Sequence, residues 1–170
     1  MTELNLTLPH TAWPHQGNLL NAAVRRDIAD LNRLFLAYAL DPDHGADCWF
    51  QLPTATVRRL AEVPPEARER AACSPISLFE LALPQEDEPA AWHPDSVADS
   101  DTSSVERARG ETRRCFGLVA LGVARRLAES LPFSSRIALG LGSTSEARLS
   151  SLSPSESFRL ATWPGLVRPR

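Results

Sequence analysis

Apolar side chains recur at three- and four-residue spacing after residue 20, which is typical of one face of an α-helix. The first such stretch begins near Asn21, and its apolar positions are Leu31, Leu34, Phe35 and Tyr38. The turn-forming residues 41–45 predict its end. A short apolar patch follows at residues 48–52.

Two short helices are predicted after this patch. Thr54 is a suitable N-cap for the first helix, and Val57 and Leu60 supply its apolar face. A pair of prolines at positions 64 and 65 separates it from the second helix, predicted over Glu66–Cys73. Residues 77–83 fit a strand and a short helix equally well, because periodicity does not separate them.

A long helix is predicted over Glu106–Glu129. Its apolar face contains Cys115, Leu118, Val119, Gly122, Val123, Arg126 and Leu127. Leu131-Pro132-Phe133 ends it, and the apolar run 137–142 predicts a short strand. The sequence S-x-x-E, which allows a reciprocal capping box, then occurs at 143–146 and 153–156, and each predicts a short helix. The expected fold class is therefore all-α, with short strands possible at the end of each half.

The two halves of the chain match each other at low identity. A shift of 89 positions places Leu52 on Leu141, Pro65 on Pro154 and Ala72 on Ala161. The preceding helices align at a shift of 87. A duplicated helical unit explains the matched order of elements, and chance similarity of two helical segments is the alternative. Small units of about 60 residues are marginal alone, so a duplication predicts an intramolecular pseudo-dimer.

Charge and composition divide the chain into four parts. Residues 1–20 are predicted to be an irregular arm, 21–83 the first repeat, 84–106 an acidic linker and 107–170 the second repeat. Every one of the 18 basic residues is Arg, and the formal net charge is −3. Residues 86–106 carry seven acids and no Arg, whereas residues 107–170 carry 11 Arg and four acids. A uniformly basic nucleic-acid binder is excluded, and a polyanion is expected to meet the second repeat.

The sequence carries little catalytic chemistry. His44 and Cys48 could share a metal, but no second pair completes a site, so no metal is expected. Cys73 and Cys115 are expected to be small packed residues, and Gly140–Ser143 lacks the lysine of a phosphate loop. We therefore expect no enzyme and no cofactor. The longest apolar run is too short to span a membrane, and no signal peptide is recognised, so a cytoplasmic location is expected.

An arginine cluster in the long helix is the strongest candidate functional surface. Its members are Arg107, Arg109, Arg113, Arg114, Arg125 and Arg126. Such a cluster suits a DNA backbone or an acidic partner, because neutralising phosphates releases counterions. Pairing with acids of this same chain is the alternative. Arg58, Arg59, Arg68, Arg148 and Arg159 on the short helices are secondary candidates, in case these helices form a helix-turn-helix.

The chain resembles the flagellar transcriptional activator FlhD family in both halves. The first half is similar over residues 27–40, 60–63, 71–72 and 78–79, and the second over 123–127, 139–152 and 158–161. The resemblance implies a mainly helical fold, an intertwined pair of units and a zinc-containing partner, FlhC. It also implies transcriptional regulation through protein assembly, with self-association possible.

The resemblance has two departures. Leu78 and Val167 stand where the family often has a dimer-linking Cys, which excludes that cross-link. The C-terminal region that helps the family contact DNA has no counterpart after Arg170. We therefore expect DNA contact, if any, to come from a partner. A non-DNA assembly or adaptor protein on the same scaffold is the alternative function.

Overall fold

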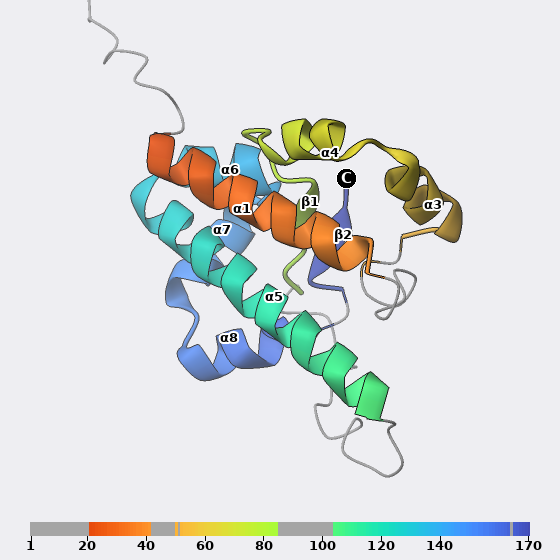
Figure 1. Ribbon diagram of the computed structural model, residues 1–170. Coiled ribbons are helices and arrows are strands. Elements are labelled where there is room, and N and C mark those ends of the chain that lie inside the picture. The colour runs from red at the N-terminus through yellow and green to blue at the C-terminus, as the bar shows by residue number, and fades with distance from the viewer. Residues whose placement is uncertain (1–20, 42–49, 51, 85–103, 164) are drawn as a thin grey trace, which may run out of the picture.

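Seven helices and a two-stranded sheet make up the described part of the chain, so the predicted mainly helical fold is confirmed (Figure 1). The computed structural model describes residues 21–41, 50, 52–84, 104–163 and 165–170. The first half contains α1 (Ala22–Ala39), α3 (Thr54–Glu62), α4 (Pro65–Ala72) and β1 (Phe79–Leu81). The second half contains α5 (Ser104–Ser130), α6 (Pro132–Leu139), α7 (Ser143–Ser151), α8 (Pro154–Ala161) and β2 (Val167–Pro169).

The helix boundaries of the first half follow local signals. Asn21 caps α1 by accepting a hydrogen bond of 2.9 Å from the backbone N–H of Val24. Pro65 occupies the first turn of α4, where its missing N–H costs nothing. The prediction that Thr54 caps α3 is wrong, because Pro53 holds the cap position and Thr54 is already helical.

The predicted strand at 137–142 is also wrong, because Ile137, Ala138 and Leu139 belong to α6. Pro132 favours a helix start at this point, and the backbone N–H of Ser135 donates to the carbonyl of Leu131 at 3.1 Å. Gly140 ends the helix in the left-handed region at φ 70°, which a residue with a Cβ rarely adopts. The apolar run therefore closes a helix rather than forming a strand.

Apart from α6, which has no counterpart among the described elements of the first half, the elements of the two halves follow the same order. Helix α7 begins 89 positions after α3, α8 begins 89 positions after α4, and β2 begins 88 positions after β1. The packing of the two halves differs, since α7 buries Glu146 and Leu149 whereas α3 has no fully buried residue. Duplication of a sequence unit, which would explain the shared order, stays a prediction.

Helix α5 buries a different face from the one predicted. Its buried residues are Phe116, Gly117, Ala120, Leu121, Ala124, Leu127 and Ala128. Of the predicted face only Leu127 is buried, while Cys115, Val119, Gly122 and Arg126 are exposed. The prediction failed because α5 has apolar residues on two opposite sides. The pattern of a single helix does not say which side meets the core.

An aromatic cluster joins the two halves. Phe116 of α5 lies 5.5 Å from Phe50 and 5.3 Å from Phe79, measured between ring centroids. Phe35 of α1 completes the group at 4.5 Å from Phe50 and 5.4 Å from Phe79. Both contacts of Phe116 are edge-to-face, an arrangement that aromatic rings prefer. A ring from the second half is thus enclosed by three rings of the first.

The strands also join the halves. Strand β1 pairs antiparallel with β2, with Glu80 opposite Arg168. The backbone N–H of Ser77, just before β1, donates to the carbonyl of Ala138 in α6 at 2.8 Å. In Figure 1 the two strands lie behind α1 and α5, which cross the front of the molecule side by side. The sheet therefore closes the core on the side opposite α5.

Asn32 fixes α1 to the segment that leads into β1. Its amide nitrogen donates to the carbonyls of Ala72 and Ile76, each at 3.1 Å. Its amide oxygen accepts from the backbone N–H of Leu78 at 2.8 Å. The side chain is fully buried, so these three bonds satisfy groups that water cannot reach.

The two predicted capping boxes have different outcomes. The box of Ser153 and Glu156 at the start of α8 is confirmed, with both reciprocal bonds present. The box at the start of α7 is wrong: Gly142 holds the cap position and makes no side-chain cap bond. Glu146 is instead buried and accepts hydrogen bonds from Ser135 and from Arg136, the latter at 2.7 Å. Tertiary pairing between α6 and α7 replaced the local cap.

We predict that Asn32→Asp destabilises the chain by about 3 kcal/mol or more at pH 7, because a buried carboxylate would face two carbonyls. Burial raises the folded-state pKa of such a carboxyl above its unfolded value of about 3.9. The loss should therefore shrink as the pH falls from 7 to 4. Denaturant unfolding at both pH values measures it. Asn21→Asp is the control, since an N-cap aspartate keeps its bond and should be near neutral.

We predict that Ser153→Ala lowers the free energy of unfolding by about 1 kcal/mol, because it removes the cap of α8. Ser143→Ala, at the site of the wrongly predicted box, should change it by less than about 0.5 kcal/mol. Thermal unfolding of the two variants tests the pair. Equal losses at both positions would contradict the assignment of the caps.

Candidate interaction surface on the second half

Helix α5 carries the six arginines that the sequence singles out. The side chains of Arg107 and Arg109 lie outside the described part of the structure, and four remain: Arg113, Arg114, Arg125 and Arg126. These form two adjacent pairs, 12 residues apart along the helix, which is about 18 Å at 1.5 Å per residue. The predicted cluster is therefore split between two places.

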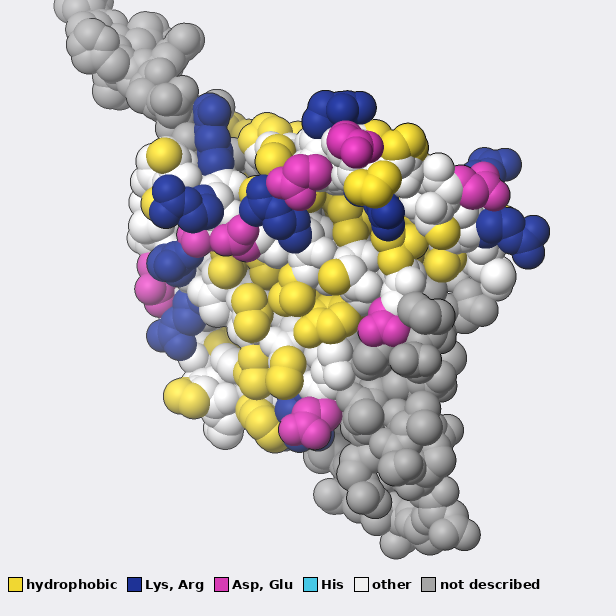
Figure 2. Space-filling view, viewed as in Figure 1, with side chains coloured by type: hydrophobic (Ala, Val, Ile, Leu, Met, Phe, Trp, Pro, Cys, Tyr) yellow, Lys and Arg dark blue, Asp and Glu magenta, His cyan; other side chains and the backbone are white. Residues whose placement is uncertain are grey.

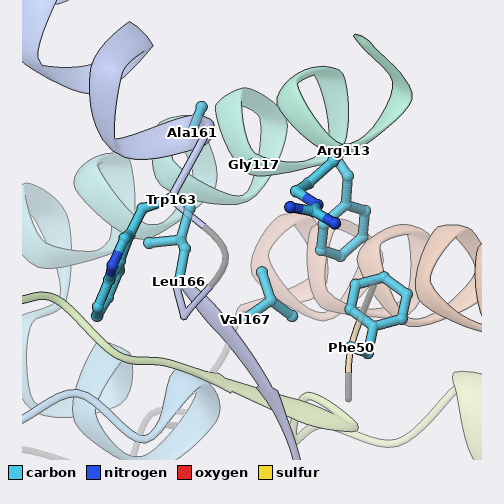
Figure 3. A pocket seen from close by; sticks show the side chains of 8 residues that line it. Phe50, Arg113, Gly117, Ala161, Trp163, Leu166 and Val167 are labelled. Carbon is cyan, nitrogen blue, oxygen red and sulfur yellow. The ribbon is translucent and has the colours of Figure 1, made fainter. Parts of the chain in front are cut away.

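Arg113 lies over a small apolar pocket (Figure 3). The other residues of its lining are Phe50, Phe116, Gly117, Ala161, Trp163, Leu166 and Val167. Figure 3 shows the Arg113 side chain reaching from α5 toward Phe50 and Val167. This lining contains no carboxylate, imidazole, thiol or hydroxyl group. The pocket therefore has one positively charged side chain and apolar walls, but no group for acid–base or nucleophilic chemistry.

Arg114 packs against α8. Its guanidinium carbon lies 4.9 Å above the centroid of the Phe158 ring, a cation–π contact. The Nε of Arg114 is buried and has no hydrogen-bond partner within the described residues. Phe158 itself is 48% exposed. This arginine therefore covers part of an exposed ring instead of projecting into solvent.

The second pair bonds within the chain. Arg125 donates to Glu129 at 2.9 Å and to the carbonyl of Leu152 at 3.0 Å. Arg126 forms an ion pair with Asp27 of α1, although 60% of the Arg126 side chain remains exposed. The described ion pairs of these two arginines are with acids of the same chain, Glu129 and Asp27, as the alternative interpretation expects; the side chains of the linker acids lie outside the described residues.

The secondary candidates are also divided. Arg58 and Arg59 are exposed on α3, and Arg159 is exposed on α8. Arg148 of α7 donates to the carbonyl of Pro84. Helices α3 and α4 follow one another closely, but neither packs closely against α5 within the described residues. The described arginines thus occupy several faces rather than one continuous strip.

Two cysteine predictions are wrong, because Cys73 and Cys115 are both exposed. Cys73 lies beside an ion pair in which Arg33 donates to Glu69 at 2.5 Å, and its thiol is 3.5 Å from both side chains. The hydrogen bond from Arg33, followed by that from Cys73, lowers the pKa of Glu69. Sequence reasoning missed this group because its members come from α1 and α4, about 40 positions apart.

Other functional predictions meet the structure only in part. His44 and Cys48 lie outside the described residues. Within the described residues no group of three His, Cys, Asp or Glu side chains could hold a metal ion. None of the helices described here combines the length and apolar character needed to cross a bilayer.

Comparisons of the chain with protein-family models, curated proteins and solved structures found no match. The resemblance to the FlhD family therefore rests on the residues quoted from the sequence. Its functional implications remain proposals.

A close helix contact positions the Arg114–Phe158 pair. A Cβ at Gly117 would lie 2.8 Å from the carbonyl oxygen of Ala161, so only glycine allows α8 to approach α5 this closely. We predict that Gly117→Ala destabilises the chain by about 1–3 kcal/mol through overpacking. Gly110→Ala, in the same helix with nothing near its Cβ, should be stabilising by up to about 1 kcal/mol. Denaturant unfolding of both variants compares them.

Proposed function

We propose that this chain is a non-catalytic regulator of transcription of the FlhD-like kind, acting in the cytoplasm through assembly with a partner protein. The observation that carries the proposal is the joining into one core of two halves whose described elements, apart from α6, follow the same order. Phe116 of the second half sits among the aromatic rings of the first, and β1 pairs with β2. A pseudo-dimer of this kind would present the surfaces of a homodimer from one polypeptide.

The arginines support a partner-supplied contact with DNA. Arg114, Arg125 and Arg126 each have a partner inside the chain. Binding phosphate through them would require these contacts to be shared or given up. A partner resembling FlhC is the expected companion, and it would bring the main DNA-binding surface.

A non-DNA adaptor is the second candidate function. It is favoured by the same internal pairing of arginines, together with exposed apolar side chains that suit protein contacts. Val119, Phe133, Ile137 and Phe158 are all more than 40% exposed. If the chain is an adaptor, it forms a complex with its partner protein, and that complex does not bind DNA.

The proposal is tested by measuring DNA binding over a range of salt concentrations, with the chain alone and with an FlhC-like protein from the same genome. We predict no salt-dependent binding by the chain alone and binding by the complex. Each phosphate contact adds about 0.9 to the slope of log affinity against log salt. Arg113→Glu with Arg114→Glu should therefore lower the slope of the complex by less than about 1.

The matched control is Arg58→Glu with Arg59→Glu, an adjacent exposed pair on α3. A fall in slope of about 2 for the α5 variant alone would assign phosphate contacts to this chain and contradict partner-supplied contact. A complex that forms but never binds DNA would favour the adaptor. If no complex forms and no DNA binds, the regulator proposal is refuted.

A further inference from the structure

Helix α5 has a second apolar face on the side away from the core. Five exposed residues recur along it at three- and four-residue spacing and form what we call the outer stripe: Glu111, Cys115, Val119, Gly122 and Arg126. Leu118 and Val123 flank the stripe and are half-buried. Residues 111 to 126 extend over about 22 Å of helix. Four of its residues, all except Glu111, belong to the face that the sequence predicted to meet the core.

The outer stripe leaves apolar surface open on the described part of the molecule. Val119 is 49% exposed, and Phe158 of the neighbouring α8 is 48% exposed. Figure 2 shows hydrophobic side chains gathered over the middle of α5, with charged side chains toward both ends of the patch. A helix that faces solvent on one side normally carries polar residues there, so the uncharged stretch from Cys115 to Gly122, with Phe158 beside it, suits a contact with another surface.

The charges at the ends of the stripe identify its occupant. Glu111 lies at one end and Arg126 at the other, with Cys115, Val119 and Gly122 between them. When two such helices pack antiparallel about a twofold axis between positions 118 and 119, each Glu111 meets the Arg126 of the other copy. A parallel pair would instead place like charges together. The stripe is therefore complementary to itself in the antiparallel direction, as a twofold interface requires.

Space at the interface fits the same arrangement. In the antiparallel pairing Gly122 faces Cys115 of the other copy, and Val119 lies beside the axis. A Cβ built on Gly122 has no atom within 4 Å, so this position is open to an approaching side chain. Arg126 keeps 60% of its side chain exposed beside Asp27, and a guanidinium has donors for two carboxylates.

We propose that two copies of this chain associate through the outer stripe of α5, packed antiparallel about a twofold axis. The proposal concerns the outside of the pseudo-dimer and does not depend on the function proposed above. A second exposed apolar group on α6, Phe133 at 63% and Ile137 at 44%, has no charge pattern that selects an occupant. It provides the control position.

Light scattering and sedimentation of the full chain test the association. The apparent mass of the wild-type chain should rise with protein concentration toward twice the monomer mass of 18.6 kDa. Val119→Glu should weaken the dimer more than about tenfold, because each interface would hold two unpaired carboxylates. Ile137→Glu replaces a similarly exposed β-branched residue elsewhere and should leave the dimer unchanged. Circular dichroism and thermal unfolding check that both variants remain folded.

A charge exchange tests the direction of packing. One variant carries Glu111→Arg, and the other carries Arg126→Glu with Asp27→Asn, so that the new carboxylate does not face Asp27. Each variant alone should dimerise more weakly than wild type, whereas a mixture should form a heterodimer in which both charge pairs are restored. A wild-type chain that stays monomeric at all concentrations overturns the proposal. A dimer that tolerates Val119→Glu, or variants that fail to pair on mixing, would also overturn it.

Discussion

The position of Phe116 among Phe35, Phe50 and Phe79 is the contact on which the rest of the fold depends. Each half is of marginal size for burying a core alone, and the shared core removes more apolar surface from water than either half could bury by itself. The two-stranded sheet also needs this core, because an isolated strand pair is marginal in water. Asn32 and Ser77 then fix the backbone around it through buried hydrogen bonds.

Burial of Phe116 also sets the rotation of α5 and thereby the surroundings of its charges. With this ring inward, Arg114 lies against α8 and Arg126 lies beside Asp27 of α1. Arginines that are close together in sequence consequently point to different neighbours. The electrostatic role of the second half is decided by those neighbours as much as by its excess of positive charge, since an exposed arginine near a carboxylate is already partly neutralised.

The same rotation leaves the outer stripe of α5 facing outward. The inner side contains glycine and several alanines, which allow α8 to approach closely at Gly117. The outer side contains Cys115, Val119 and Gly122 between opposite charges. One helix thus makes an internal contact through small residues, and its outer stripe is the surface through which we propose self-association.

The sequence predicted local structure correctly where a side chain interacts with its own backbone neighbours. The start of α1 near Asn21, the capping box of α8, the proline starts of α4 and α8 and the helical class all follow from contacts within a few residues. Tertiary structure decided the rest. Glu146 accepts hydrogen bonds from Ser135 and Arg136 instead of forming the predicted cap. Residues 137–139 belong to a helix, and α5 buries the face opposite to the predicted one. The arginines of α5 are evident in the sequence, but partners such as Asp27 and Phe158 lie on other helices and could not be predicted from it. The periodicity of a sequence indicates how many apolar faces a helix has, but only the packing of the other elements decides which of these faces is buried.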